Sequence, residues 1–166
     1  MWRYFLVFFA LLMCSSRSSA QNPFTLNLVF VSDPGGASLA GSGTSSASLN
    51  FGTVRAFGGT VPSGVTKSVG ASNWTLNTTI DVNVTKGGLD ILDILSTSYT
   101  LTASLQATDF QNTWKWNSIT LSTATSTITT TGVYGSSPAY SFSLTIPFSA
   151  PAGTISNTIN FTAVAN

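Results

Sequence analysis

The sequence predicts an all-β fold of about eight strands, arranged as a β-sandwich or a barrel. Apolar and polar side chains alternate along one segment after another, which is the period of an extended strand with one buried face. Turn residues, mainly Gly and Pro, separate these segments at short intervals, and no amphipathic helix of useful length interrupts them. Only 7% of the residues are charged, so Thr, Ser and Asn must supply most of the exposed strand faces.

Residues 1–20 predict a cleavable secretory signal peptide. A basic start at Arg3, an apolar run over residues 5–13 and small residues up to Ala20 match the three parts of such a leader. We therefore expect an exported protein, secreted or held at the cell surface after passage through the periplasm, with a single domain over residues 21–166. Cys14 would leave with the leader, because the large Met13 before it does not suit a lipid-attachment site. The domain would then fold without a disulfide.

The domain is expected to open with an N-terminal strand over residues 21–34, followed by a flexible Gly/Ser segment over residues 35–48. Four apolar residues take every second position in this strand: Phe24, Leu26, Leu28 and Phe30. A sheet has to bury them, either the sheet of the same chain or that of a neighbouring subunit that accepts the strand from a donor. Burial of four such side chains would contribute roughly 6–12 kcal/mol as an upper estimate, enough for a durable joint between subunits.

Further strands are expected along the rest of the chain. One begins at residues 48–54, turn residues dominate 56–70, and residues 74–84 give the longest alternation. The phase of the alternation changes at Asn117-Ser118, which predicts a bulge there. The later alternating segments are residues 99–105, 114–116, 119–121, 126–131, 140–146 and 155–163.

The residues that carry most enzyme chemistry are missing. The chain has no His and no Glu, and its one Cys lies in the leader, which excludes Ser-His-Asp and Cys-His catalysis and the usual zinc sites. Asp90 and Asp93 are the only close pair of carboxylates, and we interpret them as the solvent-facing ends of a turn. We therefore expect a protein that is not an enzyme and that uses no metal or cofactor.

The charge balance argues against nucleic acid as a partner. After loss of the leader, four basic residues face five Asp, so the net charge of the domain is −1 and no basic patch remains. Low charge also removes much of the repulsion that keeps protein molecules apart, which favours self-association.

Trp114 and Trp116 are the candidate residues for ligand binding. They occupy alternate positions, so both project from one face of a strand. If that face is exposed, the two indoles would form a flat platform for the sugar rings of a polysaccharide. If it is buried, they belong to the core, as a Trp often does in immunoglobulin-like sandwiches.

Three stretches near the two ends of the chain carry a family resemblance. They are the alternating residues 24–31, the element Leu-Asn-Phe-Gly-Thr-Val at residues 49–54, and residues 151–162, where a Pro/Gly turn leads into an alternating Thr-rich strand. Together they resemble the bacterial spore coat protein U-like and fimbrial (pilin-type) subunit group. The middle of the chain is unmatched, and two features common in the group are missing: a disulfide, and an aromatic residue at or near the C-terminus.

The resemblance implies a non-enzymatic structural protein, a pilus- or coat-type subunit of the cell surface. It also implies an immunoglobulin-like β-sandwich of about eight antiparallel strands that lacks one strand of its own, export with a periplasmic chaperone and usher, and donor-strand exchange through Phe24, Leu26, Leu28 and Phe30. Partners would be further copies of the chain or other pilus or coat subunits. Two alternatives stay open on the residues alone: a secreted carbohydrate-binding module that uses Trp114 and Trp116, and a small outer-membrane β-barrel.

Overall fold

The computed structural model describes residues 21–32, 37–39, 46–85 and 96–166. The predicted leader with Cys14 and the Asp90–Asp93 pair lie outside these ranges. Within them the chain forms eleven strands and no helix, and so it contains no helical segment that is long and apolar enough to span a bilayer. In chain order the strands are β1 (Gln21–Ser32), β2 (Ala37–Leu39), β3 (Ser46–Arg55), β4 (Val65–Val69), β5 (Asn73–Val84), β6 (Ser98–Leu105), β7 (Thr113–Trp116), β8 (Ile119–Thr120), β9 (Ser126–Val133), β10 (Ala139–Pro147) and β11 (Ile155–Ala165).

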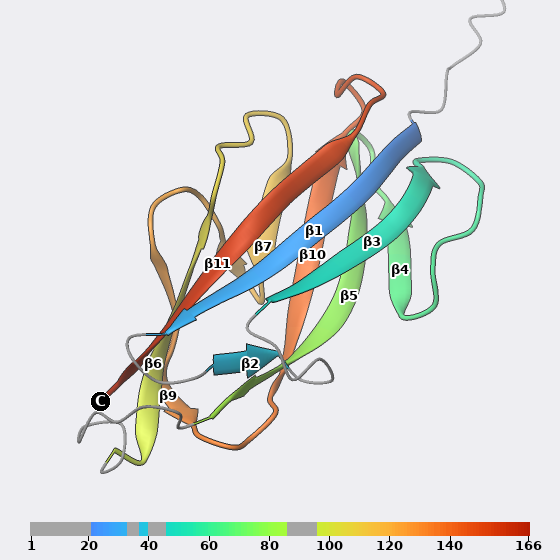
Figure 1. The fold of residues 1–166 in the computed structure, drawn as a ribbon. Helices are drawn as coiled ribbons and strands as arrows, with labels where there is room; N and C mark the ends of the chain where they lie inside the picture. The colour runs from blue at the N-terminus through green and yellow to red at the C-terminus, as the bar shows by residue number, and fades with distance from the viewer. Residues whose placement is uncertain (1–20, 33–36, 40–45, 86–95) are drawn as a thin grey trace, which may run out of the picture.

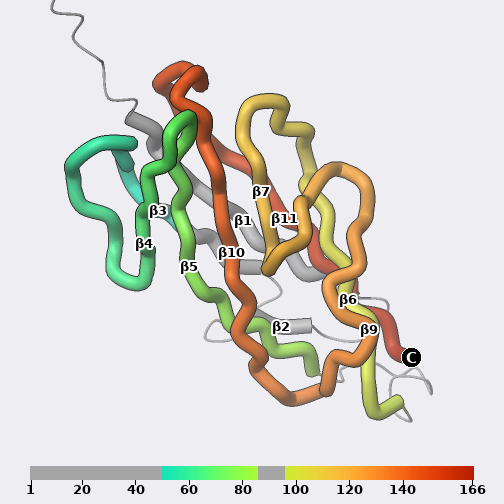
Figure 2. Tube along the Cα trace, turned by 180° about the vertical axis from the view of Figure 1, so that it is seen from behind, coloured from blue at the N-terminus to red at the C-terminus, as the bar shows by residue number. Residues whose placement is uncertain are grey.

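The strands form two sheets that lie face to face (Figure 1). The first sheet has the order β3-β1-β11-β6-β9, and the second has the order β2-β5-β10-β7-β8, with β4 also paired to β5. Figure 2, seen from behind, shows β5, β10 and β7 in front of β11. In the described part of the chain the sheets stay separate rather than closing into one barrel. The predicted all-β fold of the sandwich class is therefore confirmed, and the barrel alternative is not supported.

Pairing between neighbouring strands is antiparallel with one exception among the described pairs. The first strand, β1, runs parallel to the last strand, β11, and antiparallel to β3 on its other side. On β5, the edge that does not face β10 is shared: β4 pairs with its first half and β2 with its last three residues. The first and last strands of the described chain thus lie side by side within one sheet.

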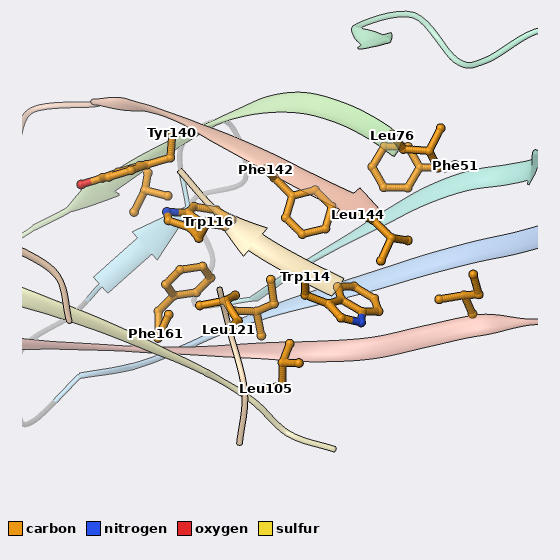
Figure 3. Packing of buried hydrophobic residues seen from close by; sticks show 14 of the residues in the cluster. Phe51, Leu76, Leu105, Trp114, Trp116, Leu121, Tyr140, Phe142, Leu144 and Phe161 are labelled. Atoms are coloured by element: carbon orange, nitrogen blue, oxygen red, sulfur yellow. The ribbon is translucent and has the colours of Figure 1, made fainter. Parts of the chain in front are cut away.

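One hydrophobic core fills the space between the sheets. Alternate residues of β6, β10 and β11 are buried, as are those at the two ends of β5, in keeping with the period of two. The core is aromatic at its centre, where Trp116 of β7 meets Phe161 of β11 edge to face with ring centroids 4.7 Å apart (Figure 3). This contact joins the two sheets, and a buried ring of this size stabilises the fold by about 1.5–3 kcal/mol through area burial alone.

Two expectations about loops are corrected by short strands. The segment 35–48, expected to be flexible, contains β2 and the first residues of β3. The segment 56–70, expected to consist of turns, contains β4. Both added strands pair through their backbones with β5, so small or polar side chains do not prevent their formation. These pieces, with β8, raise the strand count above the expected eight.

The bulge expected at Asn117-Ser118 is a hairpin turn instead. These two residues connect β7 to β8, and the residues on either side of them, Trp116 and Ile119, are register partners. Asn117 has a φ of 53°, a left-handed conformation that Asn tolerates better than most residues. A two-residue turn reverses the chain and changes the phase of the alternation just as an inserted residue would, which explains the wrong prediction.

Candidate functional site

The strand predicted to mediate assembly, β1, lies between β3 and β11 of its own chain (Figure 1). It pairs with β11 over nine register positions, from Phe24–Ile155 to Ser32–Ala163. In the described residues β3 has no other neighbour in its sheet, so β1 alone connects β3 to β11. We call the space that β1 occupies between β3 and β11 the β1 seat.

The β1 seat adjoins the inner residues of β11. The four predicted assembly residues are the register partners of residues whose side chains are buried. In order, Phe24, Leu26, Leu28 and Phe30 pair with Ile155, Asn157, Ile159 and Phe161. Withdrawal of β1 would therefore unpair the backbone of β11 beside the core, and another extended strand would have to replace it.

Trp114 and Trp116 are core residues. Their side chains are only 1% and 0% exposed, and Figure 3 shows both rings among the buried side chains between the sheets. Trp116 packs against Tyr140, with ring centroids 5.7 Å apart, as well as against Phe161. The exposed sugar platform considered for this pair is wrong, because both rings turn to the inner face of β7.

The buried indole of Trp114 is connected by one hydrogen bond to Asp109 in the loop between β6 and β7. Its Nε1–H donates to Asp109 Oδ2 at 2.7 Å, and the same oxygen accepts a bond from Asn112 Nδ2 at 2.9 Å. Asp109 Oδ1 accepts bonds from the backbone N–H groups of Gln111 and Asn112 at 3.0 and 2.9 Å. Burial acts to raise the pKa of this carboxyl, but these hydrogen bonds outweigh it and hold the pKa below its usual value. All four acceptor positions of the carboxylate are in use.

A second polar side chain fixes the start of the same loop. Asn157 of β11 is buried, and its Nδ2 donates to the carbonyl oxygen of Ala107 at 2.8 Å. Its Oδ1 accepts bonds from the N–H groups of Ala107 and Thr158 at 3.3 and 2.8 Å. The β6–β7 loop is thus tied to β11 at one end and to the core Trp114 at the other.

A pocket of about 200 Å³ lies between the β6–β7 loop and the β10–β11 loop. The two loops are neighbours at the same end of the sandwich in both views (Figures 1 and 2). We call it the loop-end pocket; Asp109, Gln111, Asn112 and residues 150–156 line it. Its walls offer amide, hydroxyl and backbone groups, the hydrogen-bonded carboxylate of Asp109 and several apolar side chains, and no Lys or Arg is among the lining residues. This arrangement suits an uncharged polar ligand better than an ion.

The sequence analysis did not identify Asp109, Asn112 or Asn157. A signal for the first was present, since an Asp that bonds to N–H groups two and three residues later is a common turn device. Asn157 gave no signal, because its partner at Ala107 is far away in the sequence. The described residues contain no group of three or more His, Cys, Asp or Glu side chains that would hold a metal ion.

The comparisons with protein-family models and with curated proteins give no match. The resemblance to the spore coat protein U-like and fimbrial group rests on its sequence motifs alone.

Proposed function

We propose that this protein is a non-enzymatic structural protein of the cell surface, a pilus- or coat-type subunit that assembles with further copies through β1. Export through the periplasm, with a chaperone and usher as partners, belongs to the same proposal and is supported by the leader-like residues 1–20 and by the motif resemblance. The observation that carries the proposal is the position of β1, the first strand of the described chain, between β3 and β11.

A strand in such a position suits exchange between copies, and removal of the predicted leader would make it N-terminal. An identical β1 from a second copy would make the same nine-position ladder with β11 and the same antiparallel pairing with β3. The contacts are equal in the closed and exchanged forms, so protein concentration and the strain in the connection from β1 to β3 decide between them. Because the donated strand and the β1 seat are different parts of the surface, successive donation extends an open chain of subunits.

The composition of the paired strands favours such an assembly. In the five strands of the first sheet Arg55 is the only charged residue. Approaching copies would therefore meet little electrostatic repulsion, and the joint would depend only weakly on salt.

A cysteine pair across the β1 seat tests the proposal. Asn27 and Ser48 are register partners on the antiparallel strands β1 and β3, and residues in this relation have Cα separations that a disulfide can bridge. We expect Asn27→Cys/Ser48→Cys, in a Cys14→Ser background, to give a ladder of covalent oligomers on non-reducing gels as the concentration rises. Intermolecular bonds would form because β1 of one copy reaches β3 of the next.

The matched control is a pair in the second sheet. Thr75 and Thr145 are register partners on β5 and β10, and their hydroxyl oxygens lie 3.0 Å apart. Thr75→Cys/Thr145→Cys should give monomers at every concentration. The proposal fails if the Asn27→Cys/Ser48→Cys variant also forms only internal disulfides over the whole concentration range.

A further inference from the structure

The loop end of the sandwich exposes an aromatic ring on a rigid support. Phe110 is 93% exposed, although burial of such a ring would stabilise the protein by about 1.5–3 kcal/mol. The loop is held on both sides of Phe110 by the bonds to Asp109 and Asn157, which keep its backbone in place. An exposed ring on a pre-organised loop loses little conformational entropy when a ligand covers it.

The loop-end pocket adjoins the backbone segment that carries this ring. Phe110 is not itself a lining residue, but its neighbours Asp109 and Gln111 line the pocket, and Thr154 of the β10–β11 loop and Ser156 of β11 lie on the opposite wall. Gln111, Thr154 and Ser156 each present uncharged groups that both donate and accept hydrogen bonds. The neutral polar groups of the pocket therefore lie near a loop position that carries an exposed aromatic ring.

A second aromatic surface lies at the base of the β10–β11 loop. Phe57 and Phe148 stack with ring centroids 5.2 Å apart, and they remain 51% and 36% exposed. Phe148 is two residues before Ala150, which lines the pocket. Exposed aromatic rings thus occur on both loops that border the pocket.

We propose that the loop-end pocket binds a neutral oligosaccharide, with the ring of Phe110 against the apolar face of one sugar unit. The hydroxyl groups of that unit would bond to Gln111, Thr154 and Ser156. Anionic ligands are disfavoured, because no Lys or Arg lines the pocket and Asp109 would repel them. A metal ion is disfavoured as well, because the four donors to Asp109 already occupy its oxygens. This inference does not depend on assembly through β1.

Binding to an array of neutral, carboxylated and sulfated oligosaccharides tests the inference with the full-length exported protein. We expect signals on neutral oligosaccharides and at least about a tenfold loss of affinity in Phe110→Ala. Because the ring is almost fully exposed, this variant should keep the melting temperature of the wild type. Val133→Ala, at an exposed apolar residue of β9 in a different part of the surface, is the matched control and should bind like the wild type.

Several outcomes would overturn the inference. They are binding to no neutral oligosaccharide, stronger binding to the acidic ones, or wild-type affinity in Phe110→Ala. Sedimentation with phosphatidylcholine vesicles is the further arm, because exposed Phe side chains also suit a lipid surface. Vesicle binding that depends on Phe110, without oligosaccharide binding, would assign this end of the sandwich to membranes instead. None of these results bears on the disulfide ladder that tests assembly.

Discussion

The ring of Tyr99 covers Gly132 across two neighbouring strands. The two residues are register partners on β6 and β9, and a Cβ built at Gly132 would lie 2.2 Å from Cε2 of Tyr99. Tyr99 is fully buried and also contacts the ring of Tyr134, with centroids 5.1 Å apart. The missing side chain at residue 132 therefore provides the space in which the Tyr99 ring lies.

Gly132→Ala should destabilise the domain by about 1–3 kcal/mol, because the new methyl group would force the Tyr99 ring or the β9 backbone to move. Chemical denaturation measures the change. Gly153→Ala is the control, since a Cβ there meets nothing within 4 Å, and it should change the free energy of unfolding by less than about 1 kcal/mol. Equal effects at the two glycines would show that the Tyr99–Gly132 packing is not tight.

The Tyr99 hydroxyl group is an unsatisfied polar group at the same place. It is buried without a hydrogen-bond partner in the described part of the chain. Burial, with smaller contributions from Tyr140 and Tyr134, raises the pKa of Tyr99 from 10.0 to about 12. Tyr99→Phe keeps the ring that fills the space over Gly132, and we expect it to leave stability unchanged or to raise it by up to about 1 kcal/mol.

The raised pKa also gives this variant a pH signature. Above pH 10 the unfolded chain releases the phenolic proton before the folded protein does, so this group's contribution to stability is complete below that pH and is lost as the pH rises towards 12. Unfolding curves between pH 9 and 12 should therefore decline less steeply in Tyr99→Phe than in the wild type. Identical slopes would mean that Tyr99 has an ordinary pKa in the folded protein.

Alternation predicted the parts of the fold that depend on local sequence. The inner face of β10 is a continuous apolar row, and that of β5 is apolar except at Thr78, so period two located these strands correctly, and it placed Trp114 and Trp116 on one face. The pattern did not determine whether that face was buried, because exposure depends on β11 across the core. The pairing of β1 with β11 could not be predicted from the sequence either, because backbone pairing between strands far apart in the chain leaves no periodic signal. The loop-end pocket was missed because hydrogen bonds, not hydrophobic spacing, build it.

Asp109 should make the domain sensitive to acid. Its pKa is lowered in the folded protein, so its contribution to stability is complete above the unfolded value of 3.8 and is lost as the pH falls below that value. Asp109→Asn removes the charge and turns an amide group towards donors, which should cost about 1–3 kcal/mol at neutral pH. Stability measured between pH 2 and 7 should therefore be lower and flatter in the variant. Asp81→Asn, at an exposed residue of β5, is the control, and it should leave the free energy of unfolding at neutral pH close to that of the wild type.

Asn157 should determine how rigid the β6–β7 loop is. Asn157→Ala removes the partner of three backbone groups, the N–H and C=O of Ala107 and the N–H of Thr158. We expect a loss of about 1–3 kcal/mol, moderated by water that reaches the exposed Ala107. Amide hydrogen exchange gives the sharper test, because it separates local from global opening.

In Asn157→Ala the amides of Ala107 and Thr158 should lose protection, whereas the amide of Leu101 in the middle of β6 should keep it. The amide of Gln106 is the informative intermediate, since it donates to the Thr158 carbonyl at 2.9 Å without involving the Asn157 side chain. If Gln106 stays protected while Ala107 exchanges, the backbone of β11 holds the chain only as far as Gln106. The side chain of Asn157 then anchors the loop that follows. Uniform loss of protection across β6 would instead make Asn157 a residue of the core, with no separate influence on the loop that carries Phe110.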